Sequence, residues 1–132
     1  MKKLSLTEAF AYYGAKLRNT RWAYSAIAND GSLVISCWER FLHTDVDGHK
    51  RYEDHLSRWQ SNHPGKNLLA DHLRQAIEGS LSVRLVVATL DNPKESESGD
   101  ASSLPKTFTT EKDLVGKVVA FDGDAFVIEF RS

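Results

Sequence analysis

The chain has 132 residues and a mass of 14.8 kDa, with 41% hydrophobic and 27% charged residues. This is enough apolar material for the core of one domain and too much for a disordered chain. The 17 Lys and Arg against 18 Asp and Glu leave a net charge of −1, so no overall field draws the protein to DNA or to an anionic membrane. The single cysteine, Cys37, excludes an internal disulfide and a multi-cysteine zinc site.

No apolar run reaches the roughly 18 residues of a membrane span, and the N-terminus lacks the apolar stretch of a secretory signal. We therefore expect a single cytoplasmic domain over residues 1–132 that has no membrane partner.

The first predicted element is a helix that begins at Leu6 and ends near Arg18. Ser5 and Glu8 have the spacing of a capping box, in which two side chains satisfy the first free amides of a helix. Apolar residues then recur at helical spacing, and these are Leu6, Phe10, Tyr13 and Leu17.

A β-hairpin is predicted next, because the apolar period changes from helical spacing to two. Residues 22–28 form the first arm, Asn29-Asp30-Gly31-Ser32 form the turn, and Leu33–Trp38 form the return arm. A two-residue loop at Asp30-Gly31 places one set of side chains on one sheet face: Trp22, Tyr24, Ile35 and Cys37. The opposite face then carries Ser25, Ile27, Val34, Ser36 and Trp38. We expect helices to cover one face and aromatic side chains to be exposed on the other.

The middle of the chain is predicted to be helical. Residues 44–50 have the composition of a polar loop, and Tyr52, Leu56 and Trp59 lie at the spacing of a short helix. After the break at residues 62–65, a second helix is predicted over about Lys66 to Glu78, with Leu69, Leu73, Ala76 and Ile77 inward and with Gly79 ending it.

The remaining elements are strands. Val83–Thr89 is an apolar, β-branched run typical of a central strand, and about 91–105 is an acidic loop. A second hairpin has arms at Lys117–Phe121 and Ala125–Phe130. The fold class is therefore α+β, with a mainly antiparallel sheet of about five strands (two β-hairpins plus a central strand) and about three helices.

Arginine and aromatic residues gather around the first hairpin. Guanidinium groups beside aromatic rings combine planar hydrogen-bond donors with stacking surfaces, the combination that holds bases or phosphorylated ligands. The candidate ligand-binding residues are Arg18, Arg21, Trp22, Tyr24, Trp38 and Arg40. The alternative is that these aromatic residues belong to the core and that the arginines are only solvated.

A second group of candidates could bind a metal. Histidine and carboxylate side chains together hold divalent ions, and four of them lie within seven residues: His43, Asp45, Asp47 and His49. The loop is too short for a calcium-binding EF-hand loop, and the sequence has no His-Glu-x-x-His motif. Ordinary surface histidines are the simpler explanation, and we expect no resident metal, no cofactor and no catalytic residue.

The residues around the first hairpin also carry a resemblance. The segments Tyr13-Gly14-Ala15, Arg18-Asn19-x-Arg21-Trp22-Ala23-Tyr24-Ser25-Ala26, Asp30-Gly31 and Trp38 resemble small bacterial proteins encoded on mobile gene cassettes (integron cassettes). Some of those proteins occur near HNH-type nucleases or are fused to them. Phe108, Val115-Gly116 and Asp122-Gly123-Asp124 are also similar to theirs. Because this chain lacks the histidine-asparagine constellation of an HNH catalytic domain, the resemblance implies a recognition part without the catalytic part.

Three functions are consistent with these patterns. The first is a non-enzymatic binding module whose arginine and aromatic cluster recognises a nucleic acid or a base-like small ligand. The second is a homodimeric or accessory interaction protein with an aromatic interface. The third is a small metal-dependent hydrolase or nuclease that uses the segment His43–His49.

Overall fold

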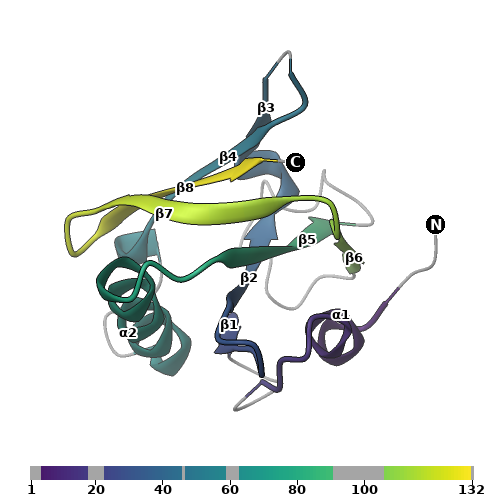
Figure 1. The fold of residues 1–132 in the computed structure, drawn as a ribbon, viewed down its shortest axis with the longest axis horizontal. Coiled ribbons are helices and arrows are strands. Elements are labelled where there is room, and N and C mark those ends of the chain that lie inside the picture. Colours follow the sequence, from purple (N-terminus) through teal and green to yellow (C-terminus); the bar gives the residue numbers. More distant parts are fainter. Residues whose placement is uncertain (1–3, 18–22, 46, 59–62, 91–105, 132) are drawn as a thin grey trace.

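The computed structural model describes residues 4–17, 23–45, 47–58, 63–90 and 106–131. Within these ranges the chain forms two α-helices, two single-turn 3-10 helices and eight β-strands (Figure 1). No described helix has the length and apolar character needed to cross a membrane. The elements, in chain order, are α1 (Leu6–Tyr12), β1 (Ser25–Ile27), β2 (Leu33–Trp38), η1 (Glu39–Phe41), β3 (Leu42–Thr44), β4 (Lys50–His55), η2 (Leu56–Arg58), α2 (Pro64–Glu78), β5 (Val83–Leu90), β6 (Lys106–Thr110), β7 (Val115–Phe121) and β8 (Ala125–Arg131).

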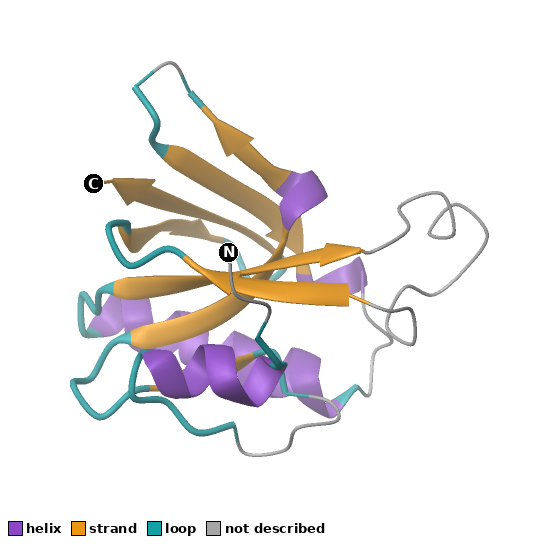
Figure 2. Cartoon of the chain, turned by 90° about the vertical axis from the view of Figure 1, so that its right-hand side faces the viewer, coloured by secondary structure: helices purple, strands orange, loops and turns teal. Residues whose placement is uncertain are grey.

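All eight strands belong to one sheet of order β1-β2-β5-β7-β8-β4-β3, with β6 also paired to β5. The pair β2–β5 is parallel and the other pairs are antiparallel. Along one edge of β5, β7 pairs at Val83 and β6 pairs from Val86 to Leu90. The sheet therefore divides at β5, and β7, β8, β4 and β3 turn away from the plane of β2 and β5 (Figure 2).

Because of this bend, two parts of the sheet share one core. Leu33, Ile35 and Leu85 on β2 and β5 pack in the same buried cluster as Ile128 and Phe130 on β8. Helix α2 completes the cluster with its buried leucines, Leu69 and Leu73. The main core therefore lies between the two parts of the bent sheet and α2.

Helix α1 covers the opposite face of β2 and β5. Phe10 of α1 is fully buried against Val34 and Val86, whose side chains point away from the main core. Both faces of the central strands are thus covered. The expectation that one face of the first hairpin is open and presents aromatic residues is wrong.

The first helix begins as predicted and ends earlier. Ser5 and Glu8 form the capping box, but Gly14 takes a left-handed conformation with φ of 76°. The amides of Gly14 and Ala15 then donate to the carbonyls of Ala11 and Phe10, which is the hydrogen-bond pattern of a Schellman motif. The helix therefore stops at Tyr12 and does not continue to Arg18.

The first hairpin is present with a different register. Ser25 pairs with Ile35 and Ala26 pairs with Val34, because the loop has three residues, Asn29 to Gly31, and Gly31 has φ of 91°. Side chains alternate between faces along a strand, so one extra loop residue moves the whole first arm to the other face. The predicted face assignments of that arm are wrong for this reason.

The predicted helix through Tyr52 and Leu56 is instead the strand β4 followed by η2. Tyr52, Asp54 and Leu56 are all buried, which is a spacing of two. The helical interpretation rested on the spacing of Tyr52, Leu56 and Trp59, and did not consider that the charged residue Asp54 is buried. The polar loop predicted over residues 44–50 is shorter than expected, because Thr44 and Lys50 pair as the last residues of β3 and β4.

Most of the later elements agree with the sequence, and the exception is β6, which was not predicted. Helix α2, the strand β5 and the hairpin β7–β8 all lie where they were predicted, and Gly79 caps α2. Ile77 is 43% exposed, so it does not point inward as expected. The class α+β with a mainly antiparallel sheet is confirmed, but the described residues form eight strands and two α-helices, where about five and about three were expected.

Candidate ligand-binding site

The predicted ligand-binding residues do not all fall in the described part of the chain. Arg18, Arg21 and Trp22 lie outside it. Tyr24 is half-buried, and its ring is stacked on that of His63 with 5.7 Å between centroids. Trp38 is the last residue of β2, and Arg40 lies in η1, which follows it directly.

Arg40 belongs to a cluster of arginine and aromatic side chains. The guanidinium carbon of Arg40 lies 4.9 Å from the centroid of the Phe41 ring, and that of Arg58 lies 5.3 Å from the same centroid. Both distances are within the range of a cation–π contact. We call Arg40, Phe41 and Arg58 the arginine–aromatic cluster; Trp38 lies two residues before Arg40, at the end of β2.

The cluster forms where two single-turn helices meet, although the strands that precede them, β2 and β4, are not neighbours in the sheet. Helix η1 continues directly from β2 and carries Arg40 and Phe41, whereas η2 continues from β4 and carries Arg58. Trp38 pairs with Ala88 in the parallel pair β2–β5. The cluster therefore lies at the carboxyl ends of the two parallel strands, an edge at which α/β proteins commonly bind ligands.

The guanidinium of Arg58 is fixed by a buried carboxylate. Its Nε donates to both oxygens of Asp54 at 2.9 and 3.1 Å, and its Nη2 donates to Oδ2 at 2.7 Å. The same carboxylate accepts from the hydroxyl of Tyr52 at 2.7 Å and from the amide of His55 at 2.8 Å. A buried carboxylate is tolerated because it is paired and hydrogen-bonded in this way.

The ionisation states around the cluster follow from burial and from this pairing. Burial acts to lower the pKa of Arg58, but the hydrogen bonds and charge of Asp54 outweigh it, so the pKa lies above its ordinary value. Burial raises the pKa of Tyr52 and of the Cys37 thiol. Arg58 is therefore a permanent cation, Tyr52 is a hydrogen-bond donor, and Cys37 is an un-ionised thiol in the core.

Sequence reasoning did not select Phe41 or Arg58 as site residues. One signal was present: Asp54 and Arg58 are separated by four residues and have opposite charges. That spacing was not used, because only the apolar residues of this segment were read, as the inward face of a short helix. In the structure, Asp54 is 7% exposed and Arg58 turns back to it across the start of η2.

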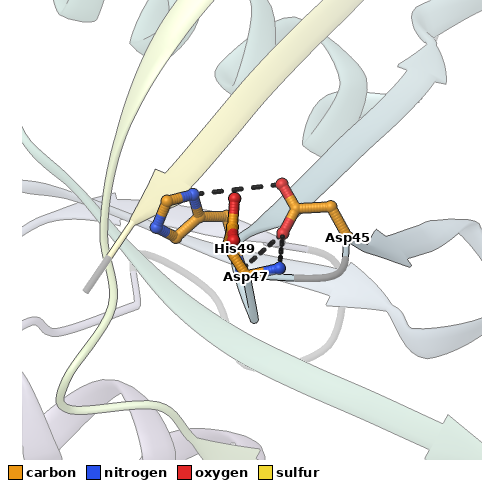
Figure 3. Close-up of side chains that lie close together, drawn as sticks. All are labelled: Asp45, Asp47 and His49. Carbon is orange, nitrogen blue, oxygen red and sulfur yellow. Dashed lines mark hydrogen bonds and ion pairs between the residues drawn. The ribbon is translucent and has the colours of Figure 1, made fainter.

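The metal candidates are brought together in part. Side-chain ligand atoms of Asp45, Asp47 and His49 lie within 4.8 Å of one another in the turn between β3 and β4 (Figure 3). His43 does not join this group, but it lines a hollow of about 270 Å³ beside it together with His49 and Glu129. Two carboxylates and an imidazole are ligands that suit a divalent cation.

The same carboxylates also explain the shape of this turn. Oδ1 of Asp45 accepts hydrogen bonds from the backbone amides of Asp47 and His49, at 2.9 and 3.0 Å. Gly48 takes a left-handed conformation in the same turn, with φ of 82°. Oδ2 of Asp45 lies 3.9 Å from Nδ1 of His49. Asp45 therefore holds the turn whether or not a cation is bound.

A serine–histidine pair lies between β1 and α2. Oγ of Ser25 and Nδ1 of His72 are 2.7 Å apart, which is the spacing of a nucleophile and its base. Ser25 is fully buried and His72 is 8% exposed, so a substrate has no access to the hydroxyl in this conformation. The pair serves to satisfy two buried polar groups and to join β1 to α2.

Comparison with known proteins finds no match to this chain among protein families, curated proteins or solved structures. The resemblance to proteins of integron cassettes stays a prediction.

Proposed function

We propose that the protein is a non-enzymatic binding module that recognises a nucleic acid or a base-like small ligand through the arginine–aromatic cluster. The observation that carries this proposal is the placement of two guanidinium groups over one ring, at 4.9 and 5.3 Å from the Phe41 centroid. Arg40 is exposed and 30% of the Arg58 side chain is exposed, so both are accessible to a ligand.

The chemistry of these groups selects a planar, electron-rich partner. A guanidinium offers a flat face for stacking and in-plane N–H donors for phosphate or base acceptors. Stacking on such groups tolerates any base, because every base has a π face. Since the net charge is −1, binding depends on these local contacts and has a shallow salt dependence, with a slope of about −1 to −2 in log K against log salt.

The test is a binding titration with a matched control. Fluorescently labelled single-stranded oligonucleotides of ten nucleotides and free mononucleotides are titrated against wild type, Arg40→Ala and Arg74→Ala. Arg74 is the control, because it is also an exposed arginine near an aromatic ring, with its guanidinium carbon 6.0 Å from the centroid of Phe121, but it lies on α2.

We expect saturable binding by wild type, a loss of about tenfold in Arg40→Ala, and no change in Arg74→Ala. A tenfold loss corresponds to about 1.4 kcal/mol, a typical contribution of one charge-assisted contact. Equal losses in the two variants, or no saturable binding by wild type, would contradict the proposal. Light scattering on Trp38→Ala tests the alternative, an interaction protein, which predicts a shift from dimer to monomer.

The hairpin turn supports a second proposal, which is that Asp45, Asp47 and His49 bind a divalent cation. The observation that supports it is that one potential ligand atom from each of these three side chains lies within 4.8 Å of the other two. This is the site that the third function, a metal-dependent hydrolase, requires. Calorimetric titration with Zn²⁺, Mn²⁺ and Mg²⁺ tests it, with Asp47→Asn expected to remove binding and the nearby Glu53→Gln expected to leave it unchanged. Absence of heat with all three ions in wild type would refute it.

A further inference from the structure

We infer that Tyr52 and Asp54 are positioning residues that hold the Arg58 guanidinium in one orientation, so that the ligand meets a preformed recognition group. This inference rests on the proposed function of the arginine–aromatic cluster. It adds to the exposed side chains that contact the ligand two buried side chains that do not contact it. Tyr52 is 1% exposed and Asp54 is 7% exposed.

The carboxylate of Asp54 cannot rotate without losing hydrogen bonds. Its two oxygens accept from three different residues: the hydroxyl of Tyr52, the amide of His55 and the Nε and Nη2 of Arg58. Rotation of the carboxylate would leave buried polar atoms without partners, which costs more than an ordinary hydrogen bond contributes. Asp54 therefore has one stable orientation.

Tyr52 fixes the carboxylate from the core side. Its ring contacts that of Phe126 with 6.0 Å between centroids, and its strand pairs with β3 on one side and β8 on the other. Side chains in a close-packed core keep a single rotamer. The hydroxyl of Tyr52 is thus a fixed donor to Asp54 Oδ2 at 2.7 Å.

Arg58 is constrained on two sides. One edge of its guanidinium, Nε and Nη2, is bonded to Asp54, and the group also lies over the Phe41 ring. A long side chain that is already ordered loses little conformational entropy when a ligand binds. The hydrogen bonds of Asp54 therefore contribute to ligand affinity, although the carboxylate itself does not contact the ligand.

The experiment is a double-mutant cycle on affinity for the ten-nucleotide single-stranded probe. The variants are Tyr52→Phe, Arg58→Ala and the double variant, measured at a temperature at which each is folded by circular dichroism. Tyr13→Phe is the control, because Tyr13 is also a tyrosine whose hydroxyl is hydrogen-bonded, but its partners are the carbonyl of Leu85 and the amide of Glu111.

We expect Tyr52→Phe to weaken binding by about three- to tenfold in the wild-type background and by less than 1.5-fold in the Arg58→Ala background. Tyr13→Phe should lower the melting temperature without a change in affinity. A loss of purely structural origin would give the same fold-change in both backgrounds, and that outcome would overturn the inference.

A spectroscopic measurement on the protein without ligand separates the two proposals. The ¹⁵N-¹H resonance of Arg58 Nε should be sharp and shifted downfield in wild type, because the hydrogen bond to Asp54 immobilises it, and should broaden in Tyr52→Phe. An unchanged resonance in Tyr52→Phe overturns the inference alone. A changed resonance with no binding of the probe by wild type overturns the proposed function instead.

Discussion

Among the described glycines, Gly116 in β7 leaves the least room for an added methyl group. It pairs with Phe130 of β8, and a Cβ at this position would lie 2.5 and 2.8 Å from two ring carbons of Phe130 and 2.9 Å from the carbonyl oxygen of Glu129. Ordinary contacts of this kind are 3.4–4 Å, so the ring would have to move by about 1 Å. Phe130 is fully buried in the main core and has no space to retreat.

We therefore expect Gly116→Ala to destabilise the protein by about 3 kcal/mol, the upper end of the usual cost of overpacking. For a chain of this size the melting temperature falls by roughly 10 °C. Urea unfolding followed by circular dichroism measures the free energy of unfolding. A loss smaller than about 1 kcal/mol would show that the ring has room to move, and would refute the packing argument.

The control for this prediction is a double variant. Phe130→Leu removes the ring edge that meets the new methyl group, so Phe130→Leu should cost less in the Gly116→Ala background than in wild type. Contacting residues give such non-additive effects, whereas distant ones add. Strict additivity would place the cost of Gly116→Ala in the backbone and not in the contact with Phe130.

Three further predictions concern other parts of the core. Val86→Ala should reduce the free energy of unfolding by about 1–3 kcal/mol, because Val86 on β5 is fully buried under α1. A loss below about 0.5 kcal/mol in urea titration would contradict this. Ser25→Ala should cost about 1–3 kcal/mol, because it removes the hydrogen bond between two buried polar groups, Oγ of Ser25 and Nδ1 of His72. Thermal melts with Ser36→Ala as a control would measure this loss. Burial raises the pKa of Tyr13 from 10.0 to about 12, so the unfolded chain loses this proton first, and stability should fall as pH rises from 10 to 12; Tyr13→Phe should reduce that slope, and an unchanged slope would be evidence against it.

The elements that the sequence predicted well are those specified by local signals. Leu69 and Leu73 recur at helical spacing after a proline, and α2 forms there. The run from Val83 to Thr89 is mainly apolar and rich in β-branched residues, and β5 becomes the central strand. In these segments no distant residue is needed to decide the outcome.

The errors arose where a distant partner decides the structure. Tyr52 and Leu56 fit a helix as well as a strand until the partner strand β8 is known, and that strand lies more than 65 residues later. Asp54 could not be predicted as buried, because its compensation comes from the hydroxyl of Tyr52 and from Arg58 only after β4 and η2 have formed. In the first hairpin, one additional loop residue changed the faces of a whole arm.

The sequence predicted the residue types of the candidate site, arginine and aromatic residues, better than it predicted which residues form it. Trp38 and Arg40 were selected because arginine lies beside aromatic residues in the sequence, and the structure places Arg40 with Phe41 and Arg58. Arg58 lies at the end of a segment that the sequence predicted as one helix and that the structure forms as the strand β4 followed by η2. Two opposite charges four residues apart, such as Asp54 and Arg58, can form an ion pair on a helix surface or in another local structure. The spacing alone does not distinguish these cases.

The parallel pair β2–β5 has a consequence for how the protein is made. Every residue of β2 from Leu33 to Trp38 pairs with a partner 50 positions later in the chain. On the ribosome, β1 and β2 emerge and can form their hairpin while β5 is still unsynthesised. Throughout that interval the apolar second edge of β2 has no strand to pair with, and such an edge recruits other chains. Nascent chains truncated before Val83 should therefore bind chaperones or aggregate, and chains extended past Leu90 should do so less.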